Sequence, residues 1–166
     1  SRRRSILIKG YNHFAGRGIE SLLGCAAAAD VLAGFSIRVT HANEAVRQAI
    51  AAIAARTGLD IAEQPFQADR SSHFARLSDS RIAVGIGVSD GISMSQLEAM
   101  AYGAFPIQGS GACASEWIEP GRTGFIVSPF DPAAIAEAIR RAVEDDALVD
   151  EAAIANRATV EARWNR

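Results

Sequence analysis

Short apolar runs, each followed by a stretch with helical character, alternate along the whole of this chain. We expect the apolar runs to form strands at residues 5–9, 35–39, 59–63, 81–86, 104–108 and 124–127. We expect helices at 18–33, 43–57, 69–77, 93–102, around 116–117, from 131 onward and at 148–164. Apolar strands that alternate with helices form a parallel sheet covered by helices on both faces. The sequence therefore predicts a Rossmann-like, doubly wound α/β domain with three layers, α/β/α.

Capping residues support several of these boundaries. Asn43 and Asp69 are suited to begin helices, because their side chains accept hydrogen bonds from free backbone N–H groups. Gly58 suits the end of the second helix. Asp131 followed by Pro132 is typical of a helix start, with the acid as the cap and proline in the first turn.

The size and charge of the chain limit its function. Its 166 residues suffice for one domain with a full hydrophobic core. The formal net charge is −2, whereas a nucleic-acid-binding domain needs a basic face, so we expect no nucleic-acid partner. We interpret the arginine-rich residues 1–4 as a linker or terminal remnant, with a phosphate or membrane contact as the alternative. Residues 5–166 then form the domain.

The apolar pattern and the cysteines indicate the compartment. No apolar stretch approaches the roughly 20 residues that a membrane span needs, and no signal peptide is evident. Cys25 and Cys113 lack metal-ligand spacing, lie among small or apolar residues, and are interpreted as packing residues rather than a disulfide. We therefore expect a cytoplasmic protein. The many alanines and the single lysine, Lys9, suggest a bacterial source.

Ligands of doubly wound sheets bind beyond the carboxyl ends of the strands. The loop after the first strand has glycines at 10, 16 and 18, a spacing that fits neither the dinucleotide-binding fingerprint nor a P-loop. Arg17 lies where this loop opens the next helix, and the free backbone N–H groups there suit an anion. His13 would add a donor. The alternatives are a surface position for Arg17 and loop packing for His13.

The loop after the fourth strand combines glycine, serine and carboxylates. Gly91 lets the backbone approach a ligand closely, and Ser93 or Ser95 caps the helix that follows. The N–H groups of such a helix start suit phosphate, whereas Asp90 and Glu98 suit hydroxyl groups. Phosphate together with hydroxyls describes a nucleotide sugar. The alternative is that Asp90 is a turn residue and Glu98 a partner of the helix dipole.

The signature of group 1 retaining glycosyltransferases, family four, resembles residues 89–107, which read S-D-G-I-S-M-S-Q-L-E-A-M-A-Y-G-A-F-P-I. Its common form is S-E-G-F-G-L-x-x-L-E-A-M-A-x-G-x-P-V, with an E-x7-E pair. Here Asp90 replaces the first glutamate and Glu98 is the second. Residues 8–18 are similar to the opening strand and basic phosphate loop of the family, and residues 116–132 to a later segment. The resemblance covers roughly residues 5 to 164.

The resemblance implies that the chain is the donor-binding half of a GT-B fold. It implies that Glu98 binds the ribose hydroxyls, that Asp90 binds the transferred sugar and that Arg17 neutralises the diphosphate; these three are the expected catalytic residues. The expected donor-binding residues are Lys9, Gly10, Gly16, Arg17, Gly91, Ile92, Ser93, Met94 and Glu98. Tyr11 stands where the family has an arginine, and the alternation of the first strand leaves the direction of Lys9 open. We expect no metal and no other cofactor.

The implied activity is transfer of a hexosyl group from a nucleoside diphosphate sugar to a hydroxyl acceptor, with retention of anomeric configuration. The expected partners are the nucleotide sugar and the amino-terminal acceptor domain, which is absent here. Without the groups that position the acceptor, we expect the domain to bind nucleotide but to be inactive. Peripheral membrane contact is expected only through the absent half. The alternatives are a non-catalytic nucleotide-sugar-binding module and a GT-B-type nucleotide-sugar epimerase.

Overall fold

The computed structural model describes residues 3–13, 15–65, 69–89, 93–111 and 113–164. Within them, six strands form one sheet: β1 (Ser5–Lys9), β2 (Ser36–Thr40), β3 (Asp60–Glu63), β4 (Ile82–Gly85), β5 (Phe105–Gly109) and β6 (Phe125–Val127). All neighbouring strands are parallel, and their order is β3-β2-β1-β4-β5-β6. The strand order reverses between β1 and β4. The sheet is therefore doubly wound, as the sequence predicts.

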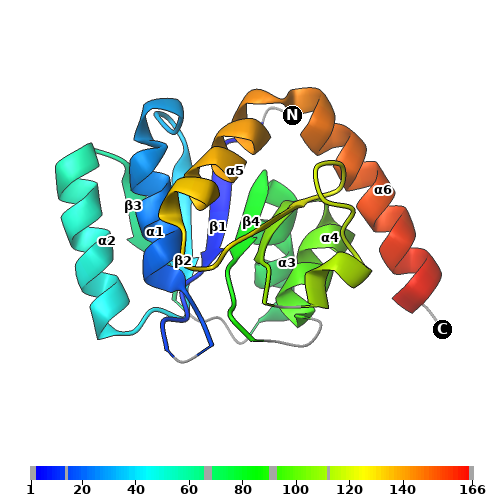
Figure 1. Cartoon of the computed structure of the whole chain (residues 1–166), viewed down its shortest axis with the longest axis horizontal. Helices are drawn as coiled ribbons and strands as arrows, with labels where there is room; N and C mark the ends of the chain where they lie inside the picture. Colours follow the sequence, from blue (N-terminus) through cyan, green and yellow to red (C-terminus); the bar gives the residue numbers. More distant parts are fainter. Residues whose placement is uncertain (1–2, 14, 66–68, 90–92, 112, 165–166) are drawn as a thin grey trace.

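Helices cover both faces of this sheet (Figure 1). One face carries α1 (Gly18–Ala27), α2 (Glu44–Thr57) and α5 (Pro132–Glu144). The other carries α3 (Arg70–Asp79) and α4 (Met94–Tyr102), and the long α6 (Asp146–Trp164) packs along α4. Two short 3₁₀ helices are η1 (Ala29–Val31) and η2 (Cys113–Glu116). In the described parts of the chain, no helix has the length and apolar character needed to cross a membrane.

Each face of the sheet has its own apolar core, because side chains alternate along a strand. In β1, Ile6 and Ile8 are fully buried in the larger core, beneath α1, α2 and α5. Leu7 points to the opposite face, where it packs with Leu77 of α3 and Ala99 of α4. The three-layer α/β/α architecture predicted from the sequence is confirmed.

The predicted caps have the expected geometry. The side chain of Asn43 accepts a hydrogen bond from the Val46 N–H at 3.0 Å, and Asp69 and Asp131 cap α3 and α5 in the same manner. Gly58 ends α2 with a φ of 74°, which a glycine adopts without a Cβ penalty. Local hydrogen-bonding chemistry therefore sets these helix ends.

The first helix is shorter than predicted. It ends at Ala27 instead of continuing to residue 33, and the chain goes on as η1. Arg140 of α5 accounts for this end: its guanidinium donates to the Ala27 carbonyl at 2.9 Å and pairs with Asp30. A hydrogen bond from a residue 113 positions further along the chain thus takes the place of the next α-helical turn.

The arginines before β1 contact the domain. Arg3 donates to the carbonyls of Ser80 and Gly103 at 2.7 and 2.9 Å. The guanidinium of Arg4 lies over the ring of Phe35, 5.8 Å from its centroid. These contacts fasten the start of the chain to the amino ends of the strands, the end of the sheet opposite to the predicted site.

Candidate functional site

The loops that follow β1 and β4 are joined through their backbones. The Arg17 N–H donates to the Ile86 carbonyl at 3.0 Å, and the Val88 N–H donates to the Ala15 carbonyl at 2.8 Å. These two bonds flank an antiparallel bridge between Gly16 and Gly87. The two loops predicted to bind a nucleotide sugar therefore meet at the point where the strand order reverses, which is where ligands of such sheets bind.

Glycines allow the first loop to fold back on itself. A Cβ at Gly18 would lie 2.4 Å from the Gly10 carbonyl oxygen, and a Cβ at Gly16 would lie 2.5 Å from the Tyr11 carbonyl oxygen. Gly10 itself packs against the end of β2, where its N–H donates to the Thr40 carbonyl at 2.7 Å. Gly10 and Gly18 therefore serve close backbone packing, whereas Gly16 also lines a cavity between the two loops.

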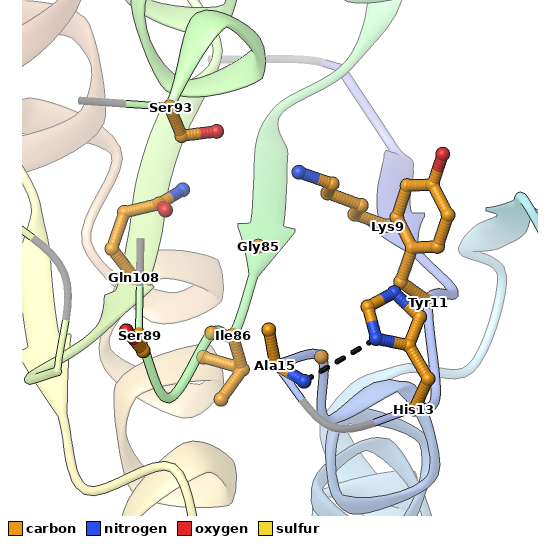
Figure 2. A pocket seen from close by; sticks show the side chains of 11 residues that line it. Lys9, Tyr11, His13, Ala15, Gly85, Ile86, Ser89, Ser93 and Gln108 are labelled. Atoms are coloured by element: carbon orange, nitrogen blue, oxygen red, sulfur yellow. Dashed lines mark hydrogen bonds between the residues drawn. The ribbon is translucent and has the colours of Figure 1, made fainter. Parts of the chain in front are cut away.

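A cavity of about 240 Å³ opens between these loops, at the carboxyl ends of β1, β4 and β5. Its walls come from Lys9, Tyr11, His13, Ala15, Gly16, Gly85, Ile86, Gly87, Ser89, Ser93 and Gln108. Figure 2 shows Lys9 reaching inward from the β1 side, with Ser93 and Gln108 facing it from the opposite side. Among these described lining residues there is no carboxylate. The cavity is therefore a basic one, suited to an anion.

Aromatic neighbours surround Lys9, whose direction the sequence left open. Its ammonium nitrogen lies 5.4 Å from the centroid of the Tyr11 ring, a cation–π distance. Tyr11 in turn stacks on His41, with ring centroids 4.5 Å apart. Burial lowers the pKa of His41 below its ordinary value of 6.5, and the charges of Lys9 and His73 lower it further. His41 is thus biased toward its neutral form beside the lysine.

Gln108 is a lining residue that the sequence did not single out. It is the next-to-last residue of β5, is only 3% exposed, and lies across the cavity from Lys9 (Figure 2). Gly85 makes room for it, since a Cβ there would lie 2.9 Å from the Gln108 amide nitrogen. Its amide makes no hydrogen bond to any described residue and offers both a donor and an acceptor to a ligand. A polar residue at the end of an otherwise apolar strand was the signal available.

The start of α4 opens into the same cavity. Ser93 is the N-cap residue of this helix, as predicted, but its side chain bonds the Ser95 hydroxyl at 2.7 Å rather than a backbone N–H. Helix N-termini offer free N–H groups and partial positive charge to anions. Met94, the next predicted donor-binding residue, is 53% exposed and lies in a separate groove.

Glu98 lies away from the walls of the basic cavity. One of its carboxylate oxygens, Oε2, is 3.0 Å from Nε2 of His73 on α3, and the other, Oε1, is 4.0 Å from the Arg70 guanidinium. His73 thus finds its partner 25 residues away in sequence, on another helix.

Arg17 also lies outside the lining of the cavity. Its guanidinium packs over the ring of Phe130, in the loop between β6 and α5, at 4.9 Å from the centroid. Its Nε atom is buried without a hydrogen-bond partner among the described residues. The remaining predicted site residues, Asp90, Gly91 and Ile92, fall outside the described residues. Within the described parts of the chain, no three His, Cys, Asp or Glu side chains gather as metal ligands do.

Solved structures establish the fold class. The C-terminal domain of a glycosyl transferase group 1 family protein from Francisella tularensis superposes with a TM-score of 0.83 at 20% identity, over 96% of this chain and 85% of that domain. Sucrose-phosphate synthase from Thermosynechococcus elongatus matches with a TM-score of 0.77 at 22% identity, over 97% of this chain but 41% of its own. The fold is that of the carboxyl-terminal domains of GT-B glycosyltransferases.

The HepE protein of Anabaena, solved in complex with UDP-glucose, matches with a TM-score of 0.78 at 16% identity, over 98% of this chain. The chain spans 45% of that protein. In sequence, the family model described as glycosyl transferases group 1 matches residues 70–145, from the start of α3 to the end of α5. No curated protein matches the sequence.

Proposed function

We propose that this chain is the donor-binding domain of a retaining glycosyltransferase of group 1. The observation that carries the proposal is the basic cavity at the carboxyl ends of β1, β4 and β5, into which Lys9 points. The match of residues 70–145 to the group 1 family supports it independently. The ligand is a nucleoside diphosphate sugar, and its diphosphate occupies this cavity.

The cavity places positive charge beside the nucleoside diphosphate, the leaving group on which negative charge develops. When the sugar departs, negative charge grows on the nucleoside diphosphate, and Lys9 together with the α4 N-terminus stabilises that charge. Ser93 and Gln108 donate hydrogen bonds to phosphate oxygens from the opposite wall. In this scheme no metal is needed. In this scheme the Arg17 side chain moves away from Phe130 to contact the diphosphate.

Carboxylates bind the sugars of the donor in this scheme. Glu98 accepts hydrogen bonds from the ribose hydroxyls, and Asp90 accepts them from the transferred hexosyl group. The parent enzyme, a cytoplasmic bacterial protein, passes that group to a hydroxyl of an acceptor held by its amino-terminal domain. The isolated domain binds donor but is inactive, because nothing in it positions the acceptor.

Calorimetry tests this proposal. The chain is titrated with UDP, GDP and ADP and their common sugars without added metal, and the titrations are repeated with Glu98→Ala. We expect one nucleotide to bind selectively and the variant to bind it more weakly. Binding of none of the three would overturn the proposal, and robust transfer by the chain alone would contradict its inactivity.

Two observations favour a non-catalytic binding module as the second candidate. Tyr11 occupies the position of the family arginine and stacks on His41, and Arg17 packs on Phe130 rather than lining the cavity. The double change Asp90→Glu with Tyr11→Arg separates the two candidates. A gain in donor affinity would indicate a weakened ancestral site, as in a module that lost catalysis. A loss would indicate a site adapted to its own donor.

A further inference from the structure

A hydrogen bond between two helices restrains the carboxylate of Glu98. Nε2 of His73 on α3 lies 3.0 Å from Oε2 of Glu98 on α4. Oε1 has no comparable partner among the described residues, since the nearest Arg70 nitrogen is 4.0 Å away. The Glu98 side chain is 22% exposed and that of His73 is 36% exposed, so solvent reaches both. The histidine therefore fixes one oxygen and leaves the other open.

Packing on α3 places His73 where it can do this. Leu77 lies one helical turn further along the same face, is 2% exposed, and belongs to the small core with Ala99 of α4. The Asp69 cap fixes the start of α3, where the His73 N–H reaches back to the Asp69 carbonyl. The position of His73 thus follows from the cap and the core, independently of its bond to Glu98.

His73 also lies next to the basic cavity. It lines a smaller, mostly apolar cavity of about 70 Å³ that shares Lys9, Gly85 and Gln108 with the basic one. Through its hydrogen bond, His73 connects this smaller cavity to Glu98, which itself lines the separate groove that also contains Met94.

We propose that His73 is a positioning residue for donor binding: its ring nitrogen holds the Glu98 carboxylate so that Oε1 faces the ribose hydroxyls. This inference rests on the proposed function and names a residue of the same site that the family signature does not contain. Partly exposed pairs of this kind contribute little to stability. A preorganised carboxylate, by contrast, binds hydroxyls without first giving up rotamer freedom.

The test compares variants of His73 in the whole chain by calorimetry. His73→Phe keeps a ring and removes the hydrogen bond, and His73→Gln restores a nitrogen donor. Arg70→Gln is the matched control, because it removes a charge near Oε1 on the same helix. The probes are the tightest-binding of UDP, GDP and ADP, its 2′,3′-dideoxy counterpart, and inorganic pyrophosphate. Thermal melting confirms that each variant is folded.

We expect His73→Phe to weaken the nucleoside diphosphate about five- to tenfold, the loss of one hydrogen bond. The dideoxy probe and pyrophosphate bind this variant within about twofold of their affinities for the unaltered chain. His73→Gln recovers most of the lost affinity for the nucleoside diphosphate, and Arg70→Gln loses none. Unchanged binding in His73→Phe, or an equal loss for all three probes, would overturn the inference and leave the proposed function intact. Failure of the unaltered chain to bind any nucleoside diphosphate would overturn both.

Discussion

The backbone N–H of Arg17 donates a hydrogen bond to the Ile86 carbonyl at 3.0 Å, which ties the loop after β1 to the loop after β4. These segments are about 70 residues apart in sequence but adjacent at the reversal of strand order. This bond, the Val88–Ala15 bond and the Gly16–Gly87 bridge join the two loops through backbone atoms. This connection does not depend on the side chains of the loops. Glycines are required wherever two such backbones approach closely.

Close approach of β5 to the β4 loop makes Gly109 sensitive to substitution. A Cβ at Gly109 would lie 2.2 Å from the Gly87 carbonyl oxygen, whereas a Cβ at Gly87 would meet nothing nearer than 3.6 Å. We expect Gly109→Ala to lower the free energy of unfolding by about 1–3 kcal/mol, the usual cost of overpacking. Gly87→Ala is the matched control, with a much smaller effect. Urea unfolding measures both, and equal losses would contradict the close approach.

The pKa of His41 responds to the positive charge of Lys9 in the cavity. Its pKa is lowered by burial first, then by Lys9 and His73. The unfolded chain therefore binds the proton more readily, so the contribution of His41 to stability is complete above its ordinary pKa of 6.5 and is lost as the pH falls through the folded pKa. In an NMR titration we expect the pKa of His41 to lie below 6.5. We expect this pKa to rise in Lys9→Met and also on addition of pyrophosphate. An unchanged pKa of His41 in Lys9→Met would contradict the contribution of the lysine.

The two cysteines differ in exposure, although the sequence pattern was interpreted as placing both in packing positions. Cys25 lies on the buried side of α1, and this burial raises the pKa of its thiol to about 12. Cys113, by contrast, is exposed in η2, so that interpretation is wrong for it. Because the thiolate is the reactive form, we expect a thiol reagent to label Cys113 in the native chain and Cys25 only after unfolding. Mass spectrometry counts the labels, with Cys113→Ser as the control that should remain unlabelled.

Features set by local chemistry could be predicted from the sequence. The apolar strands, the caps Asn43, Asp69 and Asp131, and the two loops that meet at the switch point all follow from periodicity, side-chain hydrogen bonding and strand polarity. The fold class followed from them.

Features set by contacts between distant segments could not be predicted. The stop of α1 at Ala27 depends on Arg140, and the bond of His73 to Glu98 depends on how α3 and α4 pack. The packing of Arg17 on Phe130 likewise joins segments that are far apart in the sequence. The two residues of each pair are far apart in sequence and belong to different elements. The periodicity of a helix or strand therefore does not predict their contact.

Removal of the Lys9 charge tests most directly whether the basic cavity binds the diphosphate of a nucleotide sugar. Lys9→Met keeps the length of the side chain, and Arg56→Met is the control, since it removes an equal charge from the last turn of α2, at the other end of the sheet. Calorimetric titration with UDP, GDP, ADP and pyrophosphate gives the affinities. We predict that Lys9→Met weakens pyrophosphate and the preferred nucleotide alike, by about tenfold or more, because charged hydrogen bonds are lost. Arg56→Met should bind as the unaltered chain does. Equal affinities for all three proteins would show that the diphosphate lies elsewhere.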